Sequence, residues 1–159
     1  MDDRQADQFR DRVDPGSDRF EFGKWPFYHM VRLVGLYTMR MDAILKPIGM
    51  DVPRWRVLMI LASYRVATIT RIADEAAVRI STMAKIIQRM AAQGLVETRP
   101  SAEDARSTEV LLTAKGHDIL VQVRAKASMV SKQAFQGVSD EELRFLNAIA
   151  GSIHDNLAP

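Results

Sequence analysis

The sequence contains no cysteine, and histidine occurs only three times, at His29, His117 and His154. The absence of cysteine excludes disulfide bonds, thiolate zinc sites, iron–sulfur clusters, cysteine nucleophiles and thiol-based redox sensing. No two histidines have the close spacing of a helical or zinc-finger metal site. We therefore expect neither a metal centre nor a cofactor.

Long apolar runs are also missing. The longest, Val57 to Ala62, is far shorter than the ~20 residues of a membrane-spanning helix. The N-terminus is acidic and lacks the apolar segment of a signal peptide. These absences predict a cytoplasmic protein that does not contact a membrane.

A strong charge of one sign is missing as well: the 159 residues carry a formal net charge of +2, and 47% of them are apolar. This composition is typical of a single compact globular domain. The charge is unevenly distributed, because residues 1–22 hold seven acidic residues and four arginines. This segment is predicted to be a charged N-terminal arm, ordered only if something such as a partner subunit holds it.

Long helices are predicted at both ends of the remaining chain. Apolar residues recur at helical spacing on two faces between residues 26 and 48, and in a heptad pattern between residues 116 and 134. A capping box at Ser139 and Glu142 starts a last helix. These helices have more apolar surface than one small domain covers, so residues 23–50 and 114–159 are predicted to be dimerisation helices. The last helix presents Leu143, Leu146, Ile149, Ala150, Ile153 and Leu157 on one face.

The middle of the chain, residues 51–113, predicts a winged helix-turn-helix. A short helix is followed by two helices joined at Ala77-Val78, and then by two strands that form a hairpin. The expected fold is mainly α with a small β-hairpin wing, flanked by N- and C-terminal dimerisation helices. The predicted elements are helices over Trp55–Ala62, Ile69–Ala76 and Arg79–Gln93, and strands over Leu95–Arg99 and Thr108–Leu112.

The helix from Arg79 to Gln93 separates apolar from polar side chains. Four apolar residues fall within an arc of about 100°, and the polar ones cover about 120° on the other side. No acidic residue occurs between Ala76 and Val96. Cations, hydroxyls and an amide on one face are what contact with phosphates and base edges requires, although a solvated amphipathic helix shows a similar pattern. The candidate DNA-binding residues here are Arg79, Ser81, Thr82, Lys85, Gln88 and Arg89; the apolar ones are Met83, Ile86, Ile87 and Met90.

The loop between the two strands is charged and holds Asp104 and Arg106. An arginine at a hairpin tip can enter the minor groove of DNA, where the potential is most negative. A carboxylate two residues earlier can hold its guanidinium by a charge-assisted hydrogen bond. The alternative is an ordinary charged turn with a weak surface ion pair.

Taken together, these segments resemble the MarR family of bacterial transcriptional regulators. The resemblance covers about residues 27–157 and is dense between 69 and 116. It implies a homodimeric winged-helix repressor, occasionally an activator, that binds a palindromic operator in double-stranded DNA. It also implies that the second helix enters the major groove, that Arg106 enters the minor groove and that Asp104 braces it. The matching segments are Thr68 to Ala73, Ser81-Thr82, Gly94 to Glu97, Asp104 to Arg106 and Leu112 to Gly116.

Two positions depart from the family pattern. Ala77 stands where the turn between the helices often has glycine, and Ile80 stands where the second helix often starts with a polar residue. Ile80 either contacts a thymine methyl group or packs against the protein. The missing cysteine excludes the direct peroxide sensing of some family members.

The resemblance further implies a small organic effector, such as an aromatic acid, bound between the dimerisation helices and the winged helix. His29 is a junction histidine in this interpretation rather than a ligand. Core packing explains aromatic and methionine residues at helical spacing equally well. The candidate effector-binding residues are Phe27, Tyr28, Met30, Val31, Arg32, Arg54, Trp55 and Leu58.

The leading interpretation is therefore a sequence-specific, homodimeric transcriptional regulator, released from its operator by the effector. The alternative is a winged-helix module that binds a protein partner instead of DNA. An enzyme is not expected, because no nucleophile–base pair, metal cluster, paired carboxylates or glycine-rich phosphate loop occurs at a usable spacing.

Overall fold

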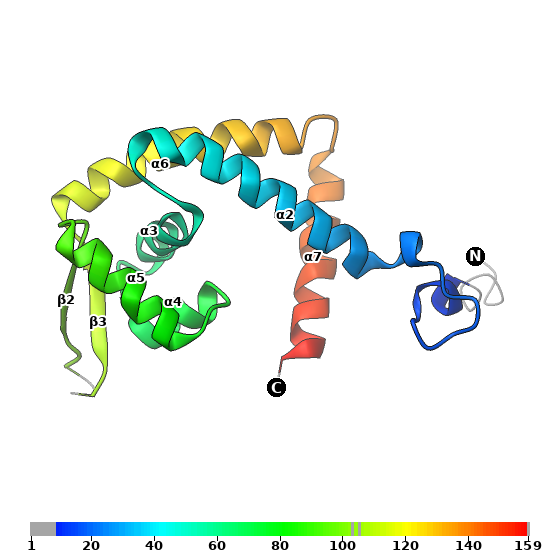
Figure 1. Cartoon of the computed structure of the whole chain (residues 1–159), viewed down its shortest axis with the longest axis horizontal. Helices are drawn as coiled ribbons and strands as arrows, with labels where there is room; N and C mark the ends of the chain where they lie inside the picture. Colours follow the sequence, from blue (N-terminus) through cyan, green and yellow to red (C-terminus); the bar gives the residue numbers. More distant parts are fainter. Residues whose placement is uncertain (1–8, 103, 105, 159) are drawn as a thin grey trace.

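The computed structural model describes residues 9–102, 104 and 106–158. Residues 1–8 of the predicted arm, and Glu103 and Ala105 of the predicted wing, lie outside the described residues. Helices dominate, and the strands form one small sheet (Figure 1). The helices are α2 (Pro26–Leu45), α3 (Val52–Tyr64), α4 (Ile69–Glu75), α5 (Ile80–Ala92), α6 (Ala114–Ala134) and α7 (Asp140–Leu157), and the strands are β1 (Val66–Thr68), β2 (Val96–Pro100) and β3 (Thr108–Leu112).

Helices α4, α6 and α7 begin where the sequence provides side-chain caps. Thr68 accepts a hydrogen bond from the backbone N–H of Arg71 at the start of α4, and Thr113 does the same for Gly116 at the start of α6. At α7 both hydrogen bonds of the predicted capping box between Ser139 and Glu142 are present. Each cap satisfies backbone donors that have no partner within the helix.

The sheet has three antiparallel strands in the order β1-β3-β2, with Ala67 and Thr98 both opposite Val110. The predicted wing is the β2–β3 hairpin. The third strand, β1, was not predicted, because three residues are too few to show the alternation that marks a strand.

The core lies where α2, α3 and α6 meet the helix-turn-helix and the sheet. Its fully buried members come from nearly every element of this part of the chain. The helix-turn-helix is therefore held rigidly on the rest of the domain. The largest of these side chains are Met41, Leu45, Leu58, Leu61, Ile72, Met83, Ile87 and Met90.

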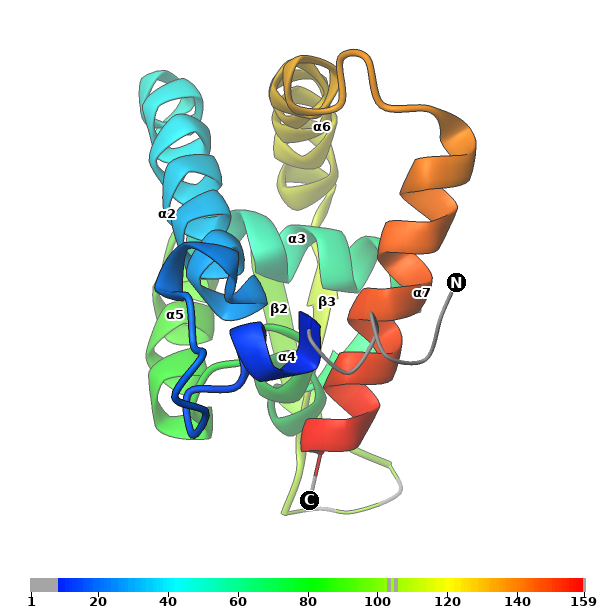
Figure 2. The same cartoon turned by 90° about the vertical axis from the view of Figure 1, so that its right-hand side faces the viewer.

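Helix α7 stands apart from this core. Figure 2 shows it separated from α2, and none of its residues is buried. On the predicted apolar face, Leu146 is 47% exposed, Ile149 is 40% exposed and Leu157 is 69% exposed. A single chain therefore leaves the predicted apolar face of α7 uncovered.

The described part of the arm is folded. The backbone N–H of Glu21 donates to the carbonyl oxygen of Arg12 at 2.9 Å, and the two side chains form an ion pair. The rings of Phe20, Phe22 and Trp25 pack edge to face or tilted against one another. These contacts order residues 9–25 at the end of α2 farthest from the winged helix-turn-helix (Figure 1).

Candidate nucleic-acid interface

Helix α5 divides as its sequence predicts. Met83, Ile86, Ile87 and Met90 are between 0% and 5% exposed and anchor the helix in the core. The candidate DNA-binding residues of this helix, Ser81, Thr82, Lys85, Gln88 and Arg89, are all exposed, and so is Arg79, the N-cap residue. Because its apolar face is packed in the core, α5 is fixed with its polar face toward solvent.

The cations of this surface are not neutralised. Within the described residues, neither Arg79 nor Lys85 forms an ion pair, and Arg89 only donates from Nε to the carbonyl oxygen of Lys85 at 3.3 Å. Ile80 at the start of α5 is 52% exposed, so it does not pack against the protein core. The surface can attract phosphates and offer an apolar contact beside them.

The wing places Asp104 and Arg106 together. Oδ1 of Asp104 accepts from the backbone N–H of Arg106 at 3.0 Å and from its Nε at 3.2 Å, and Oδ2 accepts from the hydroxyl of Ser107. The backbone N–H of Arg106, followed by its side chain, lowers the pKa of Asp104 below its ordinary value. The side chain of Arg106 is 92% exposed. The carboxylate therefore orients an arginine that is otherwise free to reach outward.

A second carboxylate stabilises the base of the wing. Glu109 of β3 accepts from Nε of Arg99 at 2.9 Å and from the hydroxyl of Ser101 at 3.1 Å. These hydrogen bonds lower the pKa of Glu109, and the one from Arg99 has the larger effect. The pair crosses from β2 to β3 and holds the hairpin in register.

A cavity of about 340 Å³ lies beside α5, between this helix and the start of α3. Arg54 reaches it from α3 and meets Gln93, which follows the last turn of α5. The sequence predicts an effector-binding role for Arg54 and no role for Gln93. Only the fold brings the two together, because they are separated by 39 positions in the chain.

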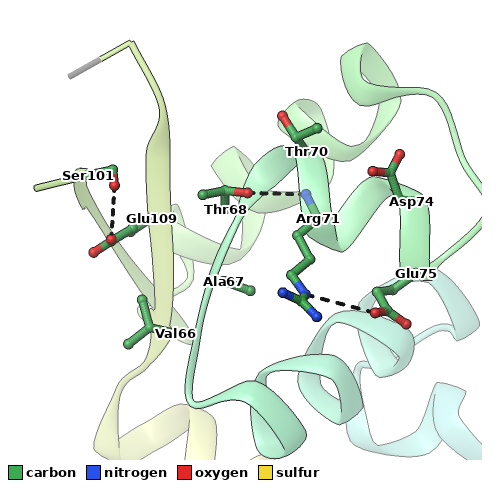
Figure 3. Close-up of a pocket in the computed structure, with 9 residues that line it drawn as sticks. All are labelled: Val66, Ala67, Thr68, Thr70, Arg71, Asp74, Glu75, Ser101 and Glu109. Carbon is green, nitrogen blue, oxygen red and sulfur yellow. Dashed lines mark hydrogen bonds and ion pairs between the residues drawn. The ribbon is translucent and has the colours of Figure 1, made fainter. Parts of the chain in front are cut away.

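A larger cavity, of about 660 Å³, lies between α4 and the sheet (Figure 3). Arg71 points into it but pairs with Glu75 at 3.9 Å and lies 4.1 Å from the ring of Tyr64. The hydroxyl of Tyr64 donates to Glu75 at 2.6 Å. Asp74 and Glu109 add further carboxylates to the lining, so this cavity is unsuited to DNA phosphates.

The eight predicted effector-binding residues do not form one pocket in the single chain. Leu58 is fully buried in the core, and Arg54 lines the cavity beside α5. Arg32 lines a different cavity, of about 520 Å³, on the outer face of α2 together with His29, Leu33, Gly35, Leu36 and Met39. A pocket built from all eight residues, closed by a second subunit, therefore stays a prediction.

The remaining predicted residues divide between α2 and α3. Nη1 of Arg32 donates to the hydroxyl of Tyr28 at 2.7 Å, Phe27 packs against Trp25, Met30 is half-buried, and Val31 is 71% exposed. Trp55 packs edge to face on Tyr37, and its Nε1 is buried with no hydrogen-bond partner among the described residues. Burial raises the pKa of Tyr37, against an opposing effect of Arg56.

Nε2 of His29 hydrogen-bonds the carbonyl oxygen of Gly23 at 2.6 Å, so this histidine has a partner. It lies near the start of α2, at the end farthest from the winged helix-turn-helix (Figure 1), and not at the predicted junction. Among the described residues, no group of histidine, aspartate and glutamate side chains is arranged to hold a metal ion. Across the same residues, no helix combines the length and hydropathy needed to cross a membrane.

The fold and the α5 surface define the winged helix-turn-helix class of transcriptional regulators. The model of the MarR family matches residues 48–107. The chain is 38% identical over 144 residues to the HTH-type transcriptional repressor IacR of Pseudomonas putida, covering 91% of this chain and 86% of that protein. The chain belongs to the MarR family, whose members are regulators of transcription and not enzymes.

Solved structures show the same fold. A MarR family transcriptional regulator from Silicibacter pomeroyi superposes with a TM-score of 0.80 at 20% identity, covering 92% of this chain and 95% of that one. A mutant MarR from E. coli complexed with operator DNA superposes with a TM-score of 0.70 at 18% identity, covering 80% of this chain and 93% of that one. NadR in complex with 4-hydroxyphenylacetate superposes with a TM-score of 0.72 at 17% identity, covering 79% of this chain and 89% of that one.

Proposed function

We propose that this protein represses transcription as a homodimer bound to a palindromic operator. The polar surface of α5 carries the proposal: a helix held by four buried residues presents cations that no carboxylate of the described residues neutralises. In this proposal the major groove is contacted by the exposed polar residues of α5 and its N-cap, namely Arg79, Ser81, Thr82, Lys85, Gln88 and Arg89. Ile80 contacts a thymine methyl group there. A relative named as a repressor and a DNA complex of a protein with the same fold support this role.

Arg106 enters the minor groove, and Asp104 holds its guanidinium in the direction of entry. The exposure of Arg106 and its hydrogen bonds to Asp104 support this assignment. The two wings and the two α5 helices then bind the two halves of one operator, about 34 Å apart. Such a protein works in the cytoplasm, where bacterial DNA is accessible.

The dimer forms through α2, α6 and α7. The uncovered apolar face of α7 and exposed residues of α2 support this arrangement, since Val31, Leu33 and Met39 are at least 60% exposed. Pairing with a second copy of the chain removes this apolar surface from water.

A small organic anion releases the dimer from DNA. The cavity on the outer face of α2 suits such an effector, because apolar side chains surround Arg32 there, and the second subunit would close it. The complex of NadR with 4-hydroxyphenylacetate supports an aromatic acid. To act as a switch, the effector must bind more tightly to a dimer whose α5 helices no longer fit the operator.

Footprinting on the intergenic DNA next to the gene, with and without 4-hydroxyphenylacetate, tests the proposal. We expect a protected palindrome and its loss with the acid. Lys85→Ala weakens operator binding about tenfold and lowers its salt dependence without loss of fold, and Arg106→Ala weakens binding to all sequences. Absence of any protected site, or wild-type affinity of the Lys85 variant, overturns the assignment of α5.

A further inference from the structure

The cavity between α3 and α5 is built around a fixed guanidinium. Nε of Arg54 donates to Oδ2 of Asp51 at 3.1 Å, and Nη1 donates to Oε1 of Gln93 at 3.1 Å. Asp51 is itself fixed, because its Oδ1 caps α3 by accepting from the backbone N–H of Arg54 at 2.9 Å. The side chain of Arg54 is only 19% exposed, so these contacts leave it little freedom.

The fixed guanidinium keeps donors available for a ligand. A guanidinium has five N–H groups, and the contacts with Asp51 and Gln93 use two of them. Nη2 of Arg54 has no hydrogen-bond partner among the described residues. A planar guanidinium with a free edge, held in advance by neighbours, is well suited to bind an oxyanion.

The charge of the cavity also favours an anion. Arg54 and Arg89 contribute two cations to the lining, and Asp51 contributes the only carboxylate. Thr82 adds a hydroxyl and Gln93 an amide. One positive charge is therefore unbalanced, and each polar side chain of the lining can donate a hydrogen bond except Asp51.

The position of the cavity identifies the anion. Thr82 and Arg89 belong both to its lining and to the exposed face of α5. A helix about 10–12 Å in diameter fills a major groove about 12 Å wide, so the flanks of that helix face the phosphates along the groove walls. We infer that Arg54, with Arg89 and Thr82, binds one backbone phosphate of the DNA. Gln93 is a positioning residue that aims Arg54.

This inference rests on the proposed DNA binding by α5. It adds a contact that carries no sequence information but sets the depth and angle at which α5 enters the groove. It also transfers Arg54 from the effector, to which the sequence interpretation assigned it, to the DNA.

The test compares Arg54→Gln with Arg54→Lys and with Arg144→Gln, which removes the same charge from an exposed position on the polar side of α7. Fluorescence anisotropy measures binding to operator and to unrelated duplex DNA at several salt concentrations. Arg54→Gln lowers both affinities by about tenfold, leaves their ratio unchanged, and reduces the salt slope by about 0.9 per phosphate lost. Arg54→Lys keeps the salt slope but not the full affinity, and Arg144→Gln behaves like wild type.

Gln93→Ala provides a second test that leaves both Arg54 and the cap of α3 in place. It lowers both affinities by about threefold with an unchanged salt slope, because the guanidinium stays but is no longer aimed. Thermal melting of each variant shows whether the fold is retained. If Arg54→Gln melts early, Gln93→Ala and Arg54→Lys decide the question.

The outcomes separate this inference from the proposed function. Wild-type DNA affinity of Arg54→Gln, alongside a loss for Lys85→Ala, overturns the phosphate contact and leaves the role of α5 intact. Wild-type affinity of both variants overturns the proposed function itself. Unchanged DNA binding with a lost response to 4-hydroxyphenylacetate shows that Arg54 serves the effector, which also overturns the inference.

Discussion

Gly116 and the carbonyl oxygen of Leu95 lie in direct contact, so that a Cβ atom at position 116 would collide with this oxygen. The first turn of α6 crosses the connection between α5 and β2 here, and the backbone N–H of Thr113 donates to the same oxygen at 3.2 Å. Backbone cannot move aside as a flexible side chain can. The contact couples the orientation of α6, a predicted dimerisation helix, to the end of α5.

Gly116→Ala is therefore expected to destabilise the fold by about 1–3 kcal/mol, the usual cost of overpacking. Urea denaturation followed by circular dichroism measures the change. Gly151→Ala is the matched control, since a Cβ there meets nothing and alanine favours the helix by about 1 kcal/mol. Equal stability of wild type and Gly116→Ala would contradict the close approach of α6.

The turn between α4 and α5 contains a strained residue. Ala77 has φ of 53°, in the left-handed region that costs a non-glycine residue about 1–2 kcal/mol. Ala77→Gly relieves this strain but adds freedom to the unfolded chain, so we expect a net stabilisation of about 0.5–1 kcal/mol. Chemical denaturation checks the sign. Ala125→Gly, in the middle of α6, should instead destabilise by about 1 kcal/mol.

The sequence was most informative where a pattern repeats over several turns. The spacing of Met83, Ile86, Ile87 and Met90 predicts which face of α5 is buried, because a helix of 13 residues samples its period more than three times. Single capping residues such as Thr113 and Ser139 were also predictable, since their hydrogen bonds are local.

Contacts between distant segments could not be predicted in this way. Strand β1 has three residues and exists because β3, about 40 positions later, pairs with it. The approach of Arg54 to Gln93 likewise depends on how α3 and α5 cross. The full burial of Leu58 likewise depends on the elements that pack around α3 and not on its neighbours in sequence.

The titration of Asp104 reports on the wing. Hydrogen bonds from Arg106 lower its folded pKa below 3.8, so their contribution to wing order is present above that pH and is lost as the pH falls through the lowered pKa. NMR of the side-chain carboxyl carbon should give a midpoint below 3.8. Arg106→Ala should raise it only in part, because the backbone N–H of residue 106, the largest cause of the shift, remains. An unchanged midpoint in this variant would show that the guanidinium does not contact Asp104.

The apolar face of α7 should hold the two subunits together. Ile149→Glu places a carboxylate among Leu146, Ile153 and the other apolar residues of this face, and a charge buried without a partner is costly. Sedimentation equilibrium should show a dimer for the wild type and a shift to monomer for the variant. Operator affinity should fall with it, since one subunit contacts only one half-site. Arg144→Glu adds the same carboxylate on the other side of α7, about 140° around the helix from Ile149, and should remain dimeric. A dimeric Ile149→Glu would place the subunit interface elsewhere on the chain.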